Sequence, residues 1–177
     1  MLYKRESIVL MNNKLNQVIV VAVVTLVIIV SGCVTSDISN INAQAININN
    51  HVKNGDHYYN ESATNTNKYL LAQALTEESN ASTEYNQAQT AAQAAYSSAQ
   101  DSNDAIFVEY LQNILNEVQA KLNATSELKT AITNLENNDT SDANDNLAAA
   151  NNYMNNALTY ENNSENIVNQ NPSKFQQ

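Results

Sequence analysis

The sequence predicts an all-α fold, an elongated antiparallel bundle of three to four helices that follows an N-terminal hydrophobic signal or anchor helix. Composition is the first indication, because two glycines and one proline in 177 residues leave little turn chemistry for a β-sandwich. Alanine, leucine and glutamine, which favour helices, are abundant. Periodicity is the second indication. Apolar residues recur at alternating spacings of three and four over most of the chain, as in helices that pack along a seam.

The chain opens with a segment typical of exported proteins. Lys4, Arg5 and Lys14 precede a 13-residue apolar run from Val18 to Val30, and small residues follow. This order of basic, apolar and small residues is that of a secretory signal. The run is shorter than the roughly 18 residues of a bilayer-spanning helix, although an uncleaved single-pass anchor without lipidation stays open.

Cys33, the only cysteine, stands three positions after Val30, the last residue of the apolar run. Val30, Ser31 and Gly32 precede it, and this stretch resembles the lipobox of lipoprotein precursors. The resemblance covers the leader alone and implies that Cys33 is diacylated and becomes the first mature residue. Two acyl chains, each burying CH₂ groups at about 0.8 kcal/mol apiece, give stable attachment to a membrane. We therefore expect a lipid-anchored protein on the extracytoplasmic face of the cell membrane.

Charge excludes one class of partner. The formal net charge is −10, and removal of the leader leaves five basic and seventeen acidic residues, a net charge of −12. A polyanion of this kind repels phosphate backbones, so nucleic acid is not an expected partner.

Domain boundaries follow from these features. Residues 1–33 form the signal peptide or anchor, with translation starting at Met1 or Met11; residues 34–170 form the bundle, and 171–177 a polar tail. The predicted helices cover about 37–53, 56–101, 104–136 and 141–168.

The first predicted helix has an apolar seam of Ile38, Ile41, Ala45, Ile48 and Val52. We expect Asn54-Gly55 to end it, because glycine readily adopts the left-handed conformation of a helix C-terminus. The second helix, about 65 Å long at 1.5 Å per residue, has a seam of mostly alanine with Glu78 as its one charged member. The first helix is expected against its first half and the later, shorter helices against its second half.

The third helix supplies bulk to this alanine seam, with Lys121 and Thr125 as interruptions. Its bulky seam residues are Phe107, Leu111, Ile114, Val118, Leu128, Ile132 and Leu135. Polar residues from Asp101 to Asp104 favour a capped turn before it, although one continuous helix stays open. Residues 137–142 read as a loop, and Asn171-Pro172 ends the fourth helix, whose seam fades through Glu161 and Ser164.

Chemically reactive side chains form no recognisable catalytic or metal pattern. His51 and His57 flank the predicted turn at Asn54-Gly55, without the i, i+4 spacing of a helical metal site. We interpret them as solvated. The aspartates of the last loop lack the calcium-loop glycine and glutamate, so we interpret them as helix-capping residues: Asp139, Asp142 and Asp145.

Glu77 and Glu78 do not form an acid-base pair, because adjacent residues on a helix diverge by about 100°. We interpret them as a solvated face. No catalytic residue, metal or cofactor is predicted, and the protein is not expected to be an enzyme.

Two polar features bear on partners. Tyr58, Tyr59 and Tyr69 lie in a polar stretch, where they serve either a partner surface or packing under the first helix. Of five N-x-S/T sequences that match the N-glycosylation acceptor pattern, the one at Asn138 falls in a predicted loop and is the predicted site.

These observations predict a surface lipoprotein whose bundle has a structural or protein-interaction role. The alternative is a small solute- or metal-binding lipoprotein, which needs convergent polar groups in the bundle core. The partner is the membrane, together with a protein or a second copy of the chain; helical seams do not distinguish these two.

Overall fold

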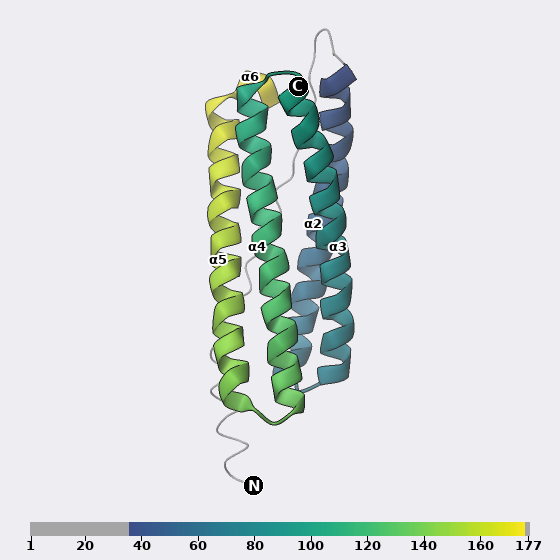
Figure 1. The fold of residues 1–177 in the computed structure, drawn as a ribbon, viewed down its shortest axis with the longest axis vertical. Helices are drawn as coiled ribbons and strands as arrows, with labels where there is room; N and C mark the ends of the chain where they lie inside the picture. Colours follow the sequence, from purple (N-terminus) through teal and green to yellow (C-terminus); the bar gives the residue numbers. More distant parts are fainter. Residues whose placement is uncertain (1–35, 176–177) are drawn as a thin grey trace.

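Residues 36–175 are described by the structure, a computed structural model. They form four long helices and a short one: α2 (Ser36–Asn67), α3 (Leu71–Asp101), α4 (Ala105–Glu136), α5 (Thr140–Gln170) and α6 (Pro172–Phe175). The long helices run up and down along the long axis of the molecule (Figure 1). The predicted all-α antiparallel bundle is confirmed.

Short turns join the long helices. A residue with positive φ lies in each turn: Tyr69 at 62°, Asn103 at 54° and Asn138 at 61°. Asp104 caps α4 by accepting hydrogen bonds from the backbone amides of Ile106 and Phe107, and Asp139 caps α5 by accepting one from the backbone amide of Asp142. The expected hairpin after residue 101 is therefore present. Aspartate suits these positions because its carboxylate satisfies the first free amides of a helix.

The predicted end of the first helix at Asn54-Gly55 is wrong, because α2 continues to Asn67 and α3 begins at Leu71. Gly55 lies inside α2, where a Cβ atom would stand 2.5 Å from Cε1 of Tyr85. Glycine at this position makes room for the tyrosine ring rather than ending the helix.

The moved boundary also corrects the predicted arrangement. The four long helices contain 32, 31, 32 and 31 residues, so each is about 48 Å long at 1.5 Å per residue. No long second helix spans two shorter neighbours. Each helix instead extends the full length of the bundle.

Packing is closest within two pairs of helices, α2 with α3 and α4 with α5. The α3 and α4 helices join the two pairs, whereas no Cα atom of α2 comes within 8 Å of one in α5. The seam of α3 consists mostly of alanine, and such small side chains let neighbouring helices approach closely. The buried alanines of α3 are Ala74, Ala81, Ala88, Ala91, Ala92, Ala95 and Ala99. The bulky residues predicted for the third helix are all buried in α4, which confirms that it fills the space beside this seam.

The predicted polar tail at 171–177 is wrong over residues 172–175. The α5 helix ends before Pro172, as expected, but the chain then forms α6 and buries Phe175. The Phe175 ring lies 5.2 Å from that of Phe107 and 5.1 Å from that of Tyr110, centroid to centroid. Lys174 also bonds to Asp104, so α6 closes the end of the bundle at which α2 begins (Figure 1).

Candidate functional site

A lysine lies in the middle of the bundle core. Lys121, on α4, is 1% exposed, and its Nζ donates to both carboxylate oxygens of Asp56 on α2, at 2.7 and 2.9 Å. Glu117, one turn earlier on α4, lies 3.3 Å from the same Nζ. One ammonium group thus connects the two helix pairs from the inside.

Tyr85, on α3, also contacts Asp56. Its hydroxyl donates a hydrogen bond of 2.7 Å to Oδ1 of Asp56. The ring rests on the backbone of α2 at Gly55, which is why the hydroxyl can reach the next residue of that helix. Lys121 Nζ also lies 5.9 Å from the centroid of the Tyr85 ring. Asp56 therefore has donors from two different helices.

Glu161 contributes from α5. It occupies a seam position, is 4% exposed, and interacts electrostatically with Glu117, Lys121 and Asp56. We name Asp56, Tyr85, Glu117, Lys121 and Glu161 the charge cluster. Every long helix of the bundle contributes to it.

Burial dominates the protonation of the cluster. It raises the pKa of Asp56 and of Glu117, against the opposing effect of Lys121, and raises the pKa of Glu161 to about 7. Burial acts to lower the pKa of Lys121, but the charges of Asp56 and Glu117 outweigh it, so this pKa is raised. The cluster accordingly combines one cation with three acids and retains a proton near neutral pH.

The charge cluster can hold a buried charge and a proton. It also fixes the register of α2 against α4. A lysine with a raised pKa stays protonated and is not a nucleophile. Its hydrogen bonds to Asp56 are satisfied only in one register of α2 against α4, so the pair selects that register over slipped alternatives.

A second buried carboxylate lies on α3. Glu78 is 3% exposed, and its Oε2 lies 3.7 Å from Nζ of Lys129 on α4. Burial raises the pKa of Glu78, although Lys129 acts in the opposite direction. The interpretation of Glu78 as a solvated residue is therefore wrong. Glu78 is buried because it lies on the apolar seam of α3, a position that sequence periodicity identified.

The lipobox residues Val30, Ser31, Gly32 and Cys33 lie outside the described residues. Asn138 lies in the turn between α4 and α5, where its side chain is exposed. The other four acceptor sequences begin within helices, at Asn60, Asn80, Asn123 and Asn162.

The histidines are apart from the charge cluster. Nδ1 of His51 lies 2.7 Å from Oε2 of Glu84, and His57 is exposed, with Glu61 at 3.8 Å. No group of three or more His, Cys, Asp or Glu within residues 36–175 is arranged to hold a metal ion. Tyr59 is fully buried, and Tyr58 and Tyr69 pack against the core, so packing inside the bundle accounts for these tyrosines.

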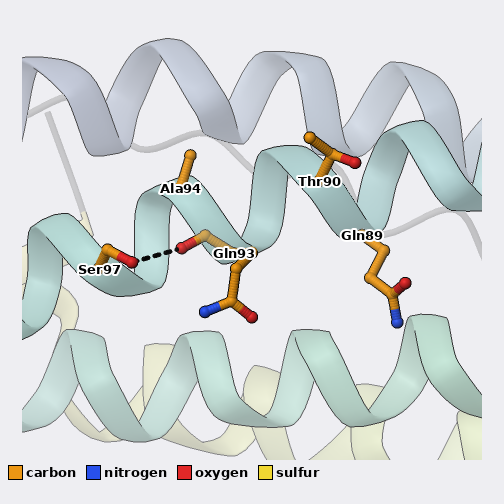
Figure 2. Close-up of a pocket in the computed structure, with 5 residues that line it drawn as sticks. All are labelled: Gln89, Thr90, Gln93, Ala94 and Ser97. Carbon is orange, nitrogen blue, oxygen red and sulfur yellow. Dashed lines mark hydrogen bonds between the residues drawn. The ribbon is translucent and has the colours of Figure 1, made fainter.

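An open polar hollow of about 400 Å³ lies on the surface of α3. Gln89, Thr90, Gln93, Ala94 and Ser97 line it, and Gln89 and Gln93 extend toward the ribbon of α4 (Figure 2). Gln89 donates a hydrogen bond of 2.9 Å to Gln119. The lining is uncharged and shallow, as expected of a contact surface rather than an enclosing ligand site.

None of the helices in residues 36–175 is both long and apolar enough to cross a membrane. Comparisons of the chain with protein-family models, with curated proteins and with solved structures found no match.

The sequence does contain one indication of the charge cluster, which is the presence of charged residues at seam positions. Lys121 and Glu161 both fall on seam positions, where charged side chains are rarely buried unless they are paired. Asp56 begins the second predicted helix, which starts after the predicted turn at Asn54-Gly55, and this position does not indicate that it pairs with Lys121. Its role emerges only once α2 is continuous.

Proposed function

We propose that the chain is an exported lipoprotein, attached through lipid on Cys33, whose bundle has a structural or protein-interaction role on the extracytoplasmic face of the cell membrane. The observation that carries the proposal is the order of the leader, an apolar run ending in Val30-Ser31-Gly32-Cys33. Helix α2 begins at Ser36, three positions after this cysteine. An anchor and a folded bundle therefore follow each other with almost no linker.

The short connection determines which part of the bundle faces the membrane. Three residues span at most about 10 Å, so a lipid on Cys33 holds the start of α2 close to the bilayer surface. The turn at 102–104 and α6 share this end of the bundle. The turns at 68–70 and 137–139 lie at the opposite end, up to about 48 Å away. We propose that contacts with other proteins involve this far end and the uncharged surface of α3.

A non-catalytic role agrees with the state of the reactive groups. The Lys121 ammonium and the Asp56 carboxylate are directed at each other in the core, and the Tyr85 hydroxyl is committed to Asp56. These groups support the fold instead of facing a substrate.

The intact mass of the protein extracted from membranes tests the anchor. We expect a mass that lacks residues 1–32 and carries two lipid chains, and we expect Cys33→Ser to abolish both changes. Thr35→Ala is the matched control and should be processed normally. A full-length mass that is unchanged by Cys33→Ser, apart from the substitution itself, would instead identify an uncleaved N-terminal helix and reject lipidation.

Glycosylation of Asn138 is the second part of the proposal, because its side chain is exposed in a turn at the end away from the anchor. A glycan adds a discrete increment to the intact mass. Asn138→Gln should remove that increment, whereas Asn80→Gln, at an exposed acceptor sequence inside α3, should leave it in place. An unmodified mass at Asn138 in the native host rejects this assignment.

A further inference from the structure

The last part of α5 is held in the bundle by polar residues. Ala157 is its last fully buried apolar residue, and the next buried seam positions are Glu161 and Ser164. Ile167 and Val168 follow, but both are only partly buried. Residues 158–170 therefore gain less from apolar burial than the first half of α5, where the seam is Ala143, Leu147, Ala150 and Met154.

Glu161 lies among groups of mostly its own charge. Asp56 from α2 and Glu117 from α4 act against its ionisation, Lys121 from α4 favours it, and Glu165 on α5 opposes it from the solvent side. Tyr85, from α3, directs its hydroxyl to Asp56 and not to Glu161. No group within residues 36–175 donates a hydrogen bond to the Glu161 carboxylate, and the Lys121 ammonium is engaged by two other acids.

We propose that residues 158–170 and α6 form a latch that is closed when Glu161 carries a proton and opens when Glu161 releases that proton to solvent. A neutral carboxylic acid can remain in this position beside the bound Lys121–Asp56 pair. An ionised one would be a third carboxylate with no donor of its own, and leaving the core restores its hydration. The first half of α5 stays packed on α4 in both states.

The direction of the pH dependence follows from the closed state. Burial, and then the charge of Glu117, raises the pKa of Glu161 to about 7, whereas the ordinary value for an exposed glutamate is about 4.3. The closed state therefore binds more protons than the open state between these two values. The closing equilibrium is most favourable below about pH 4.3 and falls by up to about tenfold per pH unit as the pH rises toward 7.

Opening of the latch exposes a defined apolar surface. Phe175 would leave its contacts with Phe107 and Tyr110, and Lys174 would leave Asp104. The α4 residues beneath the latch would then gain access to water at the end of the bundle where α2 begins. This inference does not depend on the lipid anchor, because it rests on residues of the bundle alone.

The chain provides its own reporters, because its two phenylalanines, Phe107 and Phe175, lie on opposite sides of this contact. We would label the full chain in detergent micelles with fluorophenylalanine and record ¹⁹F spectra from pH 5 to pH 8. We expect two dispersed resonances at pH 5 and a shift of the Phe175 resonance toward the free amino acid position as the pH approaches 8.

Two variants separate the latch from other titrations. Glu161→Gln keeps the shape of the protonated acid and should hold both resonances in their pH 5 positions at every pH. Asp145→Asn removes one negative charge from an exposed position on the same helix that is not among the groups acting on Glu161, and should titrate like the wild type.

Three outcomes would overturn the proposal. The first is a wild-type spectrum that does not change between pH 5 and pH 8, which needs no variant to interpret. The second is a Glu161→Gln spectrum that titrates like the wild type. The third is loss of most of the far-UV circular dichroism signal along with the Phe175 shift, because this would show global unfolding instead of opening at one end.

Discussion

Asp56 and Glu161 are two buried carboxylates of the same core in opposite circumstances. Both are 4% exposed. Asp56 accepts two hydrogen bonds from Lys121 and one from Tyr85, whereas Glu161 accepts none from the described residues. The difference shows that burial alone does not determine what an acid does in a core. Where donors surround it, the acid fixes the packing; where they are missing, it makes the packing depend on a proton.

The parts of the bundle around these two carboxylates should therefore differ in rigidity. Around Asp56, α2, α3 and α4 meet through bonds that a small displacement would break, so this layer should be rigid. Around Glu161, α5 relies on a serine and partly buried apolar residues, so this layer should open first. The predictions below test each side of the contrast, beginning with the largest effect.

Removal of the central cation should have the largest effect. Lys121→Met leaves Asp56 and Glu117 buried without a counter-charge, which should cost about 3–5 kcal/mol of unfolding free energy. Urea denaturation followed by circular dichroism measures this loss. Lys68→Met, at an exposed position after α2, is the control and should change stability by no more than about 0.5 kcal/mol. A loss below 1 kcal/mol for Lys121→Met would contradict the structural role of the pair.

Filling the space beside the Tyr85 ring should come next. Gly55→Ala places a Cβ atom 2.5 Å from Cε1 of Tyr85, so the ring must move and its bond to Asp56 is strained or lost. We expect a net destabilisation of about 1–3 kcal/mol, although alanine is the better helix former by about 1 kcal/mol.

Asn50→Ala provides the matched control for Gly55→Ala, because it changes an exposed residue of α2 little more than one turn earlier. It should stabilise the protein slightly through helix propensity. Equal stabilisation by both substitutions, measured by thermal denaturation, would mean that the close approach of Tyr85 does not constrain residue 55.

Neutralising Glu161 should produce a smaller effect that depends on pH. Because its pKa is raised to about 7, the wild type should lose stability as the pH rises from about 4.3 toward 7 and little beyond. The stability advantage of Glu161→Gln over the wild type should therefore be larger at pH 8 than at pH 5, by on the order of 1–2 kcal/mol. Urea midpoints at the two pH values measure the difference, and an advantage that is no larger at pH 8 would refute it.

The smallest effect is expected at the end of the bundle. Asp104→Ala removes the cap that accepts from the Ile106 and Phe107 amides, and it also removes the partner of Lys174, for a cost of about 1 kcal/mol. Partial burial acts to raise the pKa of Asp104, but the hydrogen bonds from Lys174 and the two amides outweigh it and lower this pKa. The contribution should be complete at neutral pH and fall as the pH drops through the lowered pKa. Asp145→Ala, at an exposed position on α5, should cost less at both pH values in thermal denaturation.

Sequence periodicity predicted the helical class, the bulky seam of α4 and the alanine seam of α3. Aspartate and asparagine at 101–104 and 137–142 predicted the turns before α4 and α5, because these residues satisfy free amides or tolerate positive φ. The structure places these turns at 102–104 and 137–139, so the second is shorter than predicted. These features depend on residues close in the sequence.

The first turn could not be found in this way. Tyr69 adopts a φ of 62°, which an aromatic residue rarely does, and neither glycine nor proline stands between residues 68 and 70. Asn54-Gly55, a common helix end, lies inside α2 because the glycine faces a ring that is 30 residues away in the sequence. The stronger local signal therefore pointed to the wrong turn.

The sequence by itself determined that this chain forms long helices with apolar seams, because helix propensity and periodicity act over a few turns. The tertiary structure alone decided which charges meet. Lys121 interrupts its own seam and gains a role only when α2 brings Asp56 within 2.7 Å of it, across 65 positions of sequence. The free energy of a buried charge depends on donors and acceptors supplied by other helices, and spacing within one helix does not contain that information.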